Sequence, residues 1–147
     1  DPQALAALPL FRCLPLEHWS ALADQLHPRA APAGALLISA EQPGEVAYLI
    51  QSGTVKVCAA RPDGSEVIIA LRGPGELVGE MSLIDEEVRS ADVVALEACR
   101  LWWIDRTALD RCLHTMPTLS RNLLRLLSRR LRWELRGAGA ADRRGAP

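Results

Sequence analysis

The sequence predicts a mainly β fold with flanking helices: a jelly-roll β-barrel (a double-stranded β-helix) followed by a long C-terminal helix. Glycines recur at positions 34, 44, 53, 64 and 73, and short runs rich in β-branched and apolar residues lie between them. Several short strands at a spacing of roughly 8–12 residues are typical of an antiparallel sandwich or barrel. After residue 116 the apolar residues instead follow the period of a helix.

Each early element has a local signal. Residues 15–26 carry five apolar side chains at helical spacing: Leu16, Trp19, Leu22, Ala23 and Leu26. Pro62-Asp63-Gly64 is a turn signal between two strands. The predicted strands are residues 35–39, 46–51, 55–59, 67–71, 92–96 and 100–104.

Two helices are expected after the β region. Asp105 is a suitable N-cap for a helix over residues 106–114, and Pro117 suits the first position of a longer helix. Gly137 and Gly139 are expected to end that helix after Arg136. Residues 1–136 are therefore expected to form one domain, with a β-roll at about 28–104, and residues 137–147 a linker or disordered tail.

Composition and charge exclude several classes of protein. The sequence has no run of about eighteen apolar residues, as a membrane span needs, and no signal peptide, so we expect a cytoplasmic protein. Residues 1–116 carry nine basic and sixteen acidic side chains, whereas residues 117–147 carry eight and two. The acidic body argues against direct nucleic-acid binding by that part of the chain.

The four cysteines are far apart and form no C-x-x-C pair, which argues against a zinc or iron–sulfur site. We expect all four to be small core hydrophobes rather than disulfide partners. They are Cys13, Cys58, Cys99 and Cys112.

The segment from Gly75 to Ala91 carries the strongest functional signal. Here a turn opened by Gly79-Glu80 precedes a cation–hydroxyl pair, Arg89-Ser90. Backbone N–H groups beside small residues can bind phosphate, and a guanidinium adds paired charged donors. The carboxylate of Glu80 can accept hydrogen bonds from ribose hydroxyls. The pattern predicts a clamp for a phosphate joined to a sugar, although each dipeptide alone is more often a solvated surface pair.

Taken whole, this segment resembles the phosphate-binding cassette of cyclic-nucleotide-binding domains, in which Gly-Glu is followed by apolar residues and Arg-Ser/Thr-Ala. Every anchor position is filled, by Gly79, Glu80, Leu83, Arg89, Ser90 and Ala91. The order of elements is similar to the sensory half of the cyclic AMP receptor/FNR (Crp/Fnr) family of bacterial transcription regulators. The resemblance covers nearly the whole chain and implies a cyclic nucleotide, cAMP or cGMP, as ligand, with no cofactor and no metal.

The resemblance also assigns contacts outside the cassette. It implies that Val57, Ile69 and Leu71 make apolar contact with the ligand. It further implies that Arg130 on the long helix pairs with Glu80 and holds that carboxylate towards the ribose.

At the base the sequence departs from the cyclic AMP receptor. Glu134 and Leu135 take the places of a threonine and a serine that read adenine, and Ala70 takes the place of a serine on a strand. Glu134 could accept hydrogen bonds from guanine or adenine, and Trp133 could stack on a purine, but both could equally be helix surface. The preferred base therefore stays open.

The long helix carries two apolar stripes. One stripe suffices to cover the core of the domain, so a second implies a partner. We expect the stripe Leu124, Leu127, Leu131 and Leu135 to form a homodimer seam, in preference to a helix buried all round within its own domain. The other stripe is Leu119, Leu123, Leu126 and Trp133.

Other functions fit less well. The three histidines, His18, His27 and His114, are far apart, and no catalytic or Walker motif is present, so we do not expect an enzyme. A stand-alone nucleotide-binding module, or a sensor of cyclic di-GMP or haem on the same fold, is the alternative. Regulators of this family carry a helix-turn-helix domain after the long helix. Only eleven residues follow Arg136, so we expect any DNA contact to need a domain missing from this chain.

Overall fold

The computed structural model describes residues 2–40, 45–79 and 91–145, and the side chains of residues 4–40, 45–79 and 91–136. The chain starts with the helices α1 (Pro2–Ala6), η1 (Pro9–Phe11) and α2 (Leu16–Ala23). It ends with α4 (Arg106–Thr115) and α5 (Pro117–Gly145). The strands between them are β1 (His27–Ala31), β2 (Leu36–Ile38), β3 (Val46–Ser52), β4 (Val55–Ala60), β5 (Glu66–Arg72), β6 (Leu77–Val78), β7 (Asp92–Ala95) and β8 (Cys99–Asp105).

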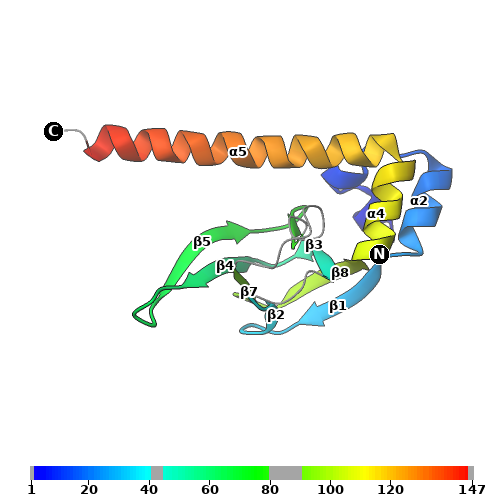
Figure 1. Cartoon of the computed structure of the whole chain (residues 1–147). Helices are drawn as coiled ribbons and strands as arrows, with labels where there is room; N and C mark the ends of the chain where they lie inside the picture. Colours follow the sequence, from blue (N-terminus) through cyan, green and yellow to red (C-terminus); the bar gives the residue numbers. More distant parts are fainter. Residues whose placement is uncertain (1, 41–44, 80–90, 146–147) are drawn as a thin grey trace.

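The strands form two four-stranded antiparallel sheets, in the orders β1-β8-β3-β6 and β2-β7-β4-β5. Consecutive strands often lie in different sheets, as expected for a jelly roll. The predicted fold class is confirmed, although the described strands form two sheets rather than a closed barrel. Figure 1 shows α5 running along one side of the roll, while α2 and α4 gather near one end.

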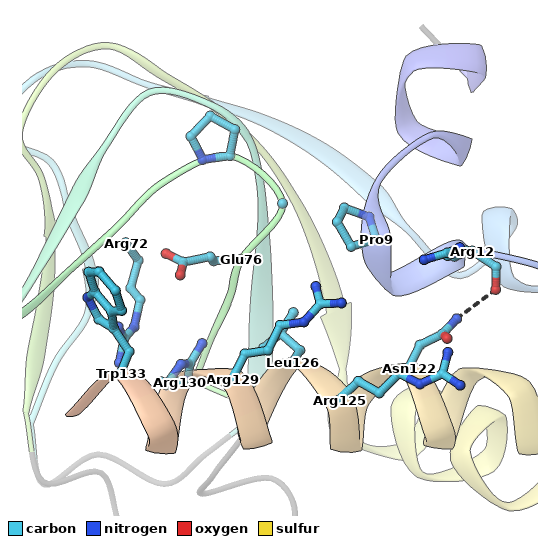
Figure 2. Close-up of a pocket in the computed structure, with 12 residues that line it drawn as sticks. Pro9, Arg12, Arg72, Glu76, Asn122, Arg125, Leu126, Arg129, Arg130 and Trp133 are labelled. Carbon is cyan, nitrogen blue, oxygen red and sulfur yellow. Dashed lines mark hydrogen bonds between the residues drawn. The ribbon is translucent and has the colours of Figure 1, made fainter. Parts of the chain in front are cut away.

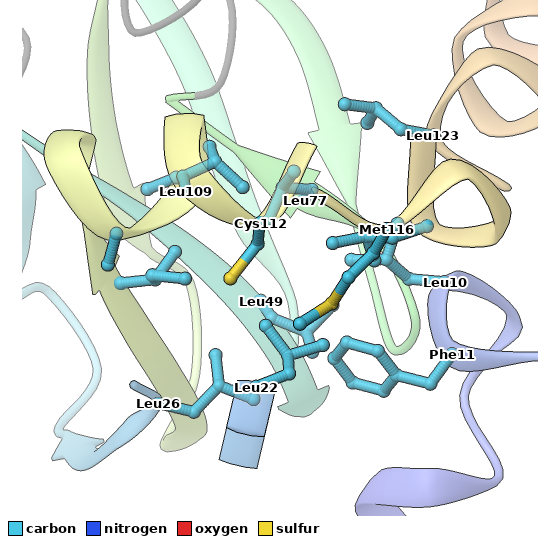
Figure 3. Close-up of a cluster of buried hydrophobic side chains, with 14 of the residues drawn as sticks. Leu10, Phe11, Leu22, Leu26, Leu49, Leu77, Leu109, Cys112, Met116 and Leu123 are labelled. Atoms are coloured by element: carbon cyan, nitrogen blue, oxygen red, sulfur yellow. The ribbon is translucent and has the colours of Figure 1, made fainter. Parts of the chain in front are cut away.

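Strand β3 explains why the molecule has two hydrophobic clusters. Successive side chains of a strand point to opposite faces, and four consecutive residues of β3 are buried. Ala47 and Leu49 belong to the cluster that the helices cover, whereas Tyr48 and Ile50 belong to the cluster formed with the second sheet. Figure 3 shows the first cluster, where side chains from η1, α2 and α4 surround Cys112 and Met116.

The start of α5 is fixed to the N-terminal segment by a buried amide. Leu119 and Leu123 are buried in the helical cluster. Between them Asn122 donates from Nδ2 to the carbonyls of Leu10, at 2.9 Å, and Arg12, at 2.8 Å. Because buried polar groups are costly unless hydrogen-bonded, this contact defines how α5 packs against η1.

Several local predictions are confirmed and others differ. Asp105 caps α4, since its Oδ1 accepts a hydrogen bond from the Ala108 N–H at 2.8 Å. Strands β1 and β6 are not among the predicted strands. The sequence of β1, His-Pro-Arg-Ala-Ala, has little β propensity, and its strand forms because it pairs along β8.

The last helix is longer than the sequence predicts. Gly137 and Gly139 do not end it at Arg136, and α5 continues to Gly145. A glycine costs only about 1 kcal/mol inside a helix, and the alanines and arginines around these two favour helix.

Cys13 also differs from its prediction as a core residue. It is exposed and has a φ of 61°, while Cys58, Cys99 and Cys112 are buried as expected. Burial raises the pKa of the Cys112 thiol, as it does for Cys58 and Cys99. Those three are therefore protected thiols.

Candidate functional site

The segment that carries the predicted clamp connects the two sheets. It leaves β6, an edge strand of one sheet, at Gly79 and enters β7, an inner strand of the other, after Ala91. Gly79 has a φ of 86°, a conformation that residues with a side chain rarely adopt, so the chain turns sharply where the predicted cassette begins. Glu80, Leu83, Arg89 and Ser90 lie outside the described residues.

An apolar surface on β4 and β5 lies in the sheet that β7 also joins. Val57 is opposite Ala70, and the next pair is Cys58 with Ile68, so Ile69 is the extra residue of a β-bulge. Val57 is half-buried and packs against the inter-sheet cluster. Ile69 and Leu71 are 60% and 56% exposed. These apolar side chains are available for a ligand or a partner.

Arg130 and Glu134 both contact the roll. Arg130 donates from Nη2 to the carbonyl of Leu77 at 2.8 Å. Leu77 lies two residues before Gly79, so this bond joins α5 to the strand that leads into the cassette. The predicted partner, Glu80, lies outside the described residues.

Glu134 lies 3.6 Å from Arg72, measured from Oε1 to Nη2. The side chain of Arg72, at the end of β5, is only 15% exposed, whereas that of Glu134 is 60% exposed. Sequence reasoning missed Arg72, because an arginine that ends an apolar run has no local signal for a partner on a helix more than fifty residues later. The residue predicted to read the base is thus paired with a strand residue.

A cavity of about 430 Å³ lies where α5 passes the N-terminal segment and the turn between β5 and β6. Figure 2 shows arginine side chains rising from α5 towards Pro9 and the turn that carries Glu76, with Trp133 beside Arg72. Of the described residues that the sequence assigns to the ligand, Arg130 lines it, as does Trp133, the candidate for stacking on a purine. Sequence reasoning missed this cavity, since its walls come from three parts of the chain.

The predicted dimer stripe has two environments. Leu124, Leu131 and Leu135 are between 58% and 67% exposed, while Leu127 packs partly against the helical cluster of its own chain. The other stripe also divides, because Leu119 and Leu123 are buried and Trp133 is exposed. An exposed apolar row on a long helix is a typical interaction surface.

Metal-binding clusters and membrane-spanning helices are both absent from the part of the chain that the structure describes. No group of three or more histidine, cysteine, aspartate or glutamate side chains there could hold a metal ion. Likewise, no helix within the described ranges has the length and apolar character needed to cross a membrane.

Comparison with known proteins identifies the family. The model of the cyclic nucleotide-binding domain matches residues 28–116, which is more than half of the chain. The chain is 34% identical over 130 residues to a CRP-like cAMP-activated global transcriptional regulator of Mycobacterium tuberculosis, covering 88% of this chain and 58% of that protein. It is 38% identical over 124 residues to a cyclic AMP receptor protein of Thermus thermophilus, covering 84% and 57%. It thus spans less than two thirds of these curated relatives.

Solved structures agree. The catabolite activator protein of Thermus thermophilus matches with a TM-score of 0.75 at 35% identity, over 91% of this chain and 63% of that one. The N-terminal domain of a transcriptional regulator from Streptomyces coelicolor matches with a TM-score of 0.68 at 32% identity, over 92% of this chain and 94% of that one. A mutant form of a cAMP-binding acyltransferase from Mycobacterium smegmatis matches with a TM-score of 0.77 at 34% identity, over 88% and 40%. The chain therefore belongs to the cyclic nucleotide-binding domain family and is related to the CRP-like transcription regulators.

Proposed function

We propose that this chain is the cyclic-nucleotide sensor of a Crp-type regulator, with the phosphate and ribose held by the segment between β6 and β7. The observation that carries the proposal is the position of that segment. It begins at Gly79 in a turn that favours glycine and ends at the inner strand β7. The motif residues Glu80, Arg89 and Ser90 belong to it, and it falls within the region that the family model matches.

The ligand class follows from the chemistry of the motif and from the relatives. In this proposal Arg89 and Ser90 bind the phosphate, Glu80 and the Gly79 turn bind the ribose, and Val57, Ile69 and Leu71 supply apolar contact. Of the relatives named above, one is described as cAMP-activated and another as cAMP-binding. Cyclic AMP is therefore the first candidate and cyclic GMP the second.

The base would be read from α5. Glu134 and Trp133 lie near Arg136, the last residue of α5 whose side chain is described. The ion pair between Glu134 and Arg72 holds this part of α5 close to β5. A purine that needs the Glu134 carboxylate must compete with the Arg72 guanidinium. A Glu134→Ala variant separates base reading from simple helix surface. We expect it to change the ratio of affinities for cyclic AMP and cyclic GMP, and an unchanged ratio would remove Glu134 from the base site.

The signal would pass through a homodimer. The exposed leucines Leu124, Leu131 and Leu135 form one row on α5, and pairing of two such rows would bring the two α5 helices together. A ligand would then favour one arrangement of the pair only by the difference in its affinity for the two. We propose that the module itself is non-enzymatic and cytoplasmic, and that any DNA contact belongs to another domain.

Calorimetric titration of an Arg89→Ala variant tests the clamp. Removing one partner of a desolvated charge pair costs about 2–5 kcal/mol, so we expect the affinity for the nucleotide to fall by at least about thirtyfold. Arg111→Ala, an exposed arginine on α4, is the matched control and should leave the affinity unchanged. Equal affinity in the Arg89 variant and the wild type would refute the clamp.

A further inference from the structure

The cavity beside α5 collects positive charge from several parts of the chain. Among the described residues, its lining includes the arginines Arg12, Arg72, Arg125, Arg129 and Arg130, against a single carboxylate, Glu76. The Glu76 carboxylate also accepts a hydrogen bond from the Gly73 N–H at 2.8 Å, which fixes it to the turn between β5 and β6. The walls of the cavity therefore carry a large excess of cationic groups.

Three of these arginines have no counterion among the described residues. Arg72 is paired with Glu134, and Arg130 donates to a backbone carbonyl. In contrast, no ion pair joins Arg12, Arg125 or Arg129 to a carboxylate of any residue that the structure describes. Like charges one helical turn apart, as at Arg125 and Arg129, destabilise a helix slightly. A bound anion would remove that cost.

The size of the cavity sets the size of the occupant. Small-molecule sites are typically about 300–1,000 Å³, and this cavity has about 430 Å³. Its cationic groups are guanidinium forks, which match phosphate and carboxylate groups with paired hydrogen bonds. Leu126, Trp133 and Pro9 supply apolar contact for a carbon skeleton. Figure 2 shows the arginines reaching the cavity from α5 and from the N-terminal segment.

We propose that this cavity binds a small organic polyanion that carries at least two phosphate or carboxylate groups, at a site separate from the cassette. The three guanidinium groups that lack a counterion among the described residues come from two separate parts of the chain, so a ligand with spaced charges fits better than one with a single charge. Helical periodicity of about 100° per residue places Arg125 and Arg129 roughly 100–160° around α5 from Leu124 and Leu131, on a different face of the helix. The proposed site can therefore be occupied while the leucine row contacts a partner.

Occupancy would tie together three parts of the chain. Arg12 follows η1, the turn at residues 73–76 leads into β6, and Arg125 and Arg129 belong to α5. A ligand that bridges them stabilises the folded arrangement more as its concentration rises above its dissociation constant. We therefore expect the melting temperature to rise with ligand concentration.

The test is calorimetric titration of the whole chain with tripolyphosphate and with citrate, which separate phosphate from carboxylate recognition. The double variant Arg125→Gln with Arg129→Gln removes two cavity cations. The control, Arg132→Gln with Arg136→Gln, removes the same charge from exposed positions of the same helix that do not line the cavity. We expect saturable binding that is at least about tenfold weaker in the first variant, a difference of about 1.4 kcal/mol, and nearly unchanged in the control.

A second variant should change the affinity for the anion in the opposite direction. Glu76→Gln keeps an oxygen acceptor for the Gly73 N–H but removes the one negative charge among the lining residues that the structure describes, so it should strengthen anion binding. The proposal is overturned by three results: no saturable binding of either anion, equal weakening in both arginine double variants, or loss of binding in Arg89→Ala with retention in the cavity variant. The last result would assign the anion to the cassette and would leave the proposed sensor function standing.

Discussion

Replacement of Gly53 by alanine tests how the two sheets are joined. Gly53 follows β3, which belongs to one sheet, and precedes β4, which belongs to the other. Its φ is 94°. A Cβ atom there would lie 2.6 Å from Cys99 Sγ, 2.7 Å from the Ala98 carbonyl oxygen and 2.9 Å from Cys99 Cα. Two of these atoms are backbone at the start of β8, so the contact cannot be relieved by rotating one side chain.

The expected loss has two parts. An L-residue in the left-handed region costs about 1–2 kcal/mol, and overpacking costs about 1–3 kcal/mol. The smaller entropy of alanine in the unfolded chain returns about 0.4–1 kcal/mol. Gly34→Ala is the matched control, because Gly34 has a φ of 87° and no described atom within 4 Å of the added Cβ. The backbone and entropy contributions therefore cancel between the two variants.

Urea denaturation followed by tryptophan fluorescence measures both variants. We expect the free energy of unfolding to fall by about 2–4 kcal/mol for Gly53→Ala, and by about 1–3 kcal/mol less for Gly34→Ala, with similar dependence on urea concentration. Equal losses in the two variants would refute the close approach of Gly53 to Cys99 and, with it, the packing of this corner.

Three further predictions concern helix docking, thiols and pH. Asn122→Ala removes one buried and one partly buried hydrogen bond to backbone carbonyls at η1, so the free energy of unfolding should fall by about 2–4 kcal/mol in urea denaturation; a loss below about 0.5 kcal/mol would contradict this docking. Cys13 should react with a thiol reagent far faster than the three buried thiols, and Cys13→Ser should abolish the fast phase; a fast phase that persists would contradict its exposure. The hydrogen bond from Lys56 lowers the pKa of Glu66. The pair therefore stabilises the fold at pH values above the pKa of Glu66 in the unfolded chain, and this stabilisation is lost as the pH falls through the pKa of Glu66 in the folded chain. In an NMR titration Lys56→Met should return the pKa of Glu66 towards its ordinary value, and an unchanged titration would rule out the pair.

The sequence predicts those parts of the fold that depend on local signals. Asp105 caps its helix because an N-cap acts within a single turn, and six of the strands are apparent from short apolar runs. Strand β1 could not be predicted, because Pro28 and its alanines become a strand only through pairing with β8. The exposure of Cys13 likewise depends on the packing of η1 and α2, and not on the residue itself.

The candidate site likewise has a part that the sequence predicts and a part that it does not. The cassette is identifiable because its residues are close in sequence and fill a fixed pattern. The contact of Glu134 with Arg72 and the cationic cavity arise where α5 crosses segments more than forty residues away. Such contacts follow from the tertiary arrangement alone, and their individual residues have ordinary surface composition.

Equilibrium dialysis of the whole chain against labelled cyclic AMP, and separately cyclic GMP, tests the sensor function most directly. If the segment between β6 and β7 is a phosphate and ribose clamp, at least one of the two nucleotides should bind saturably, with one molecule per chain, and an excess of inorganic phosphate should not displace it. Binding of neither nucleotide by a chain that is folded in the same buffer would contradict the sensor function.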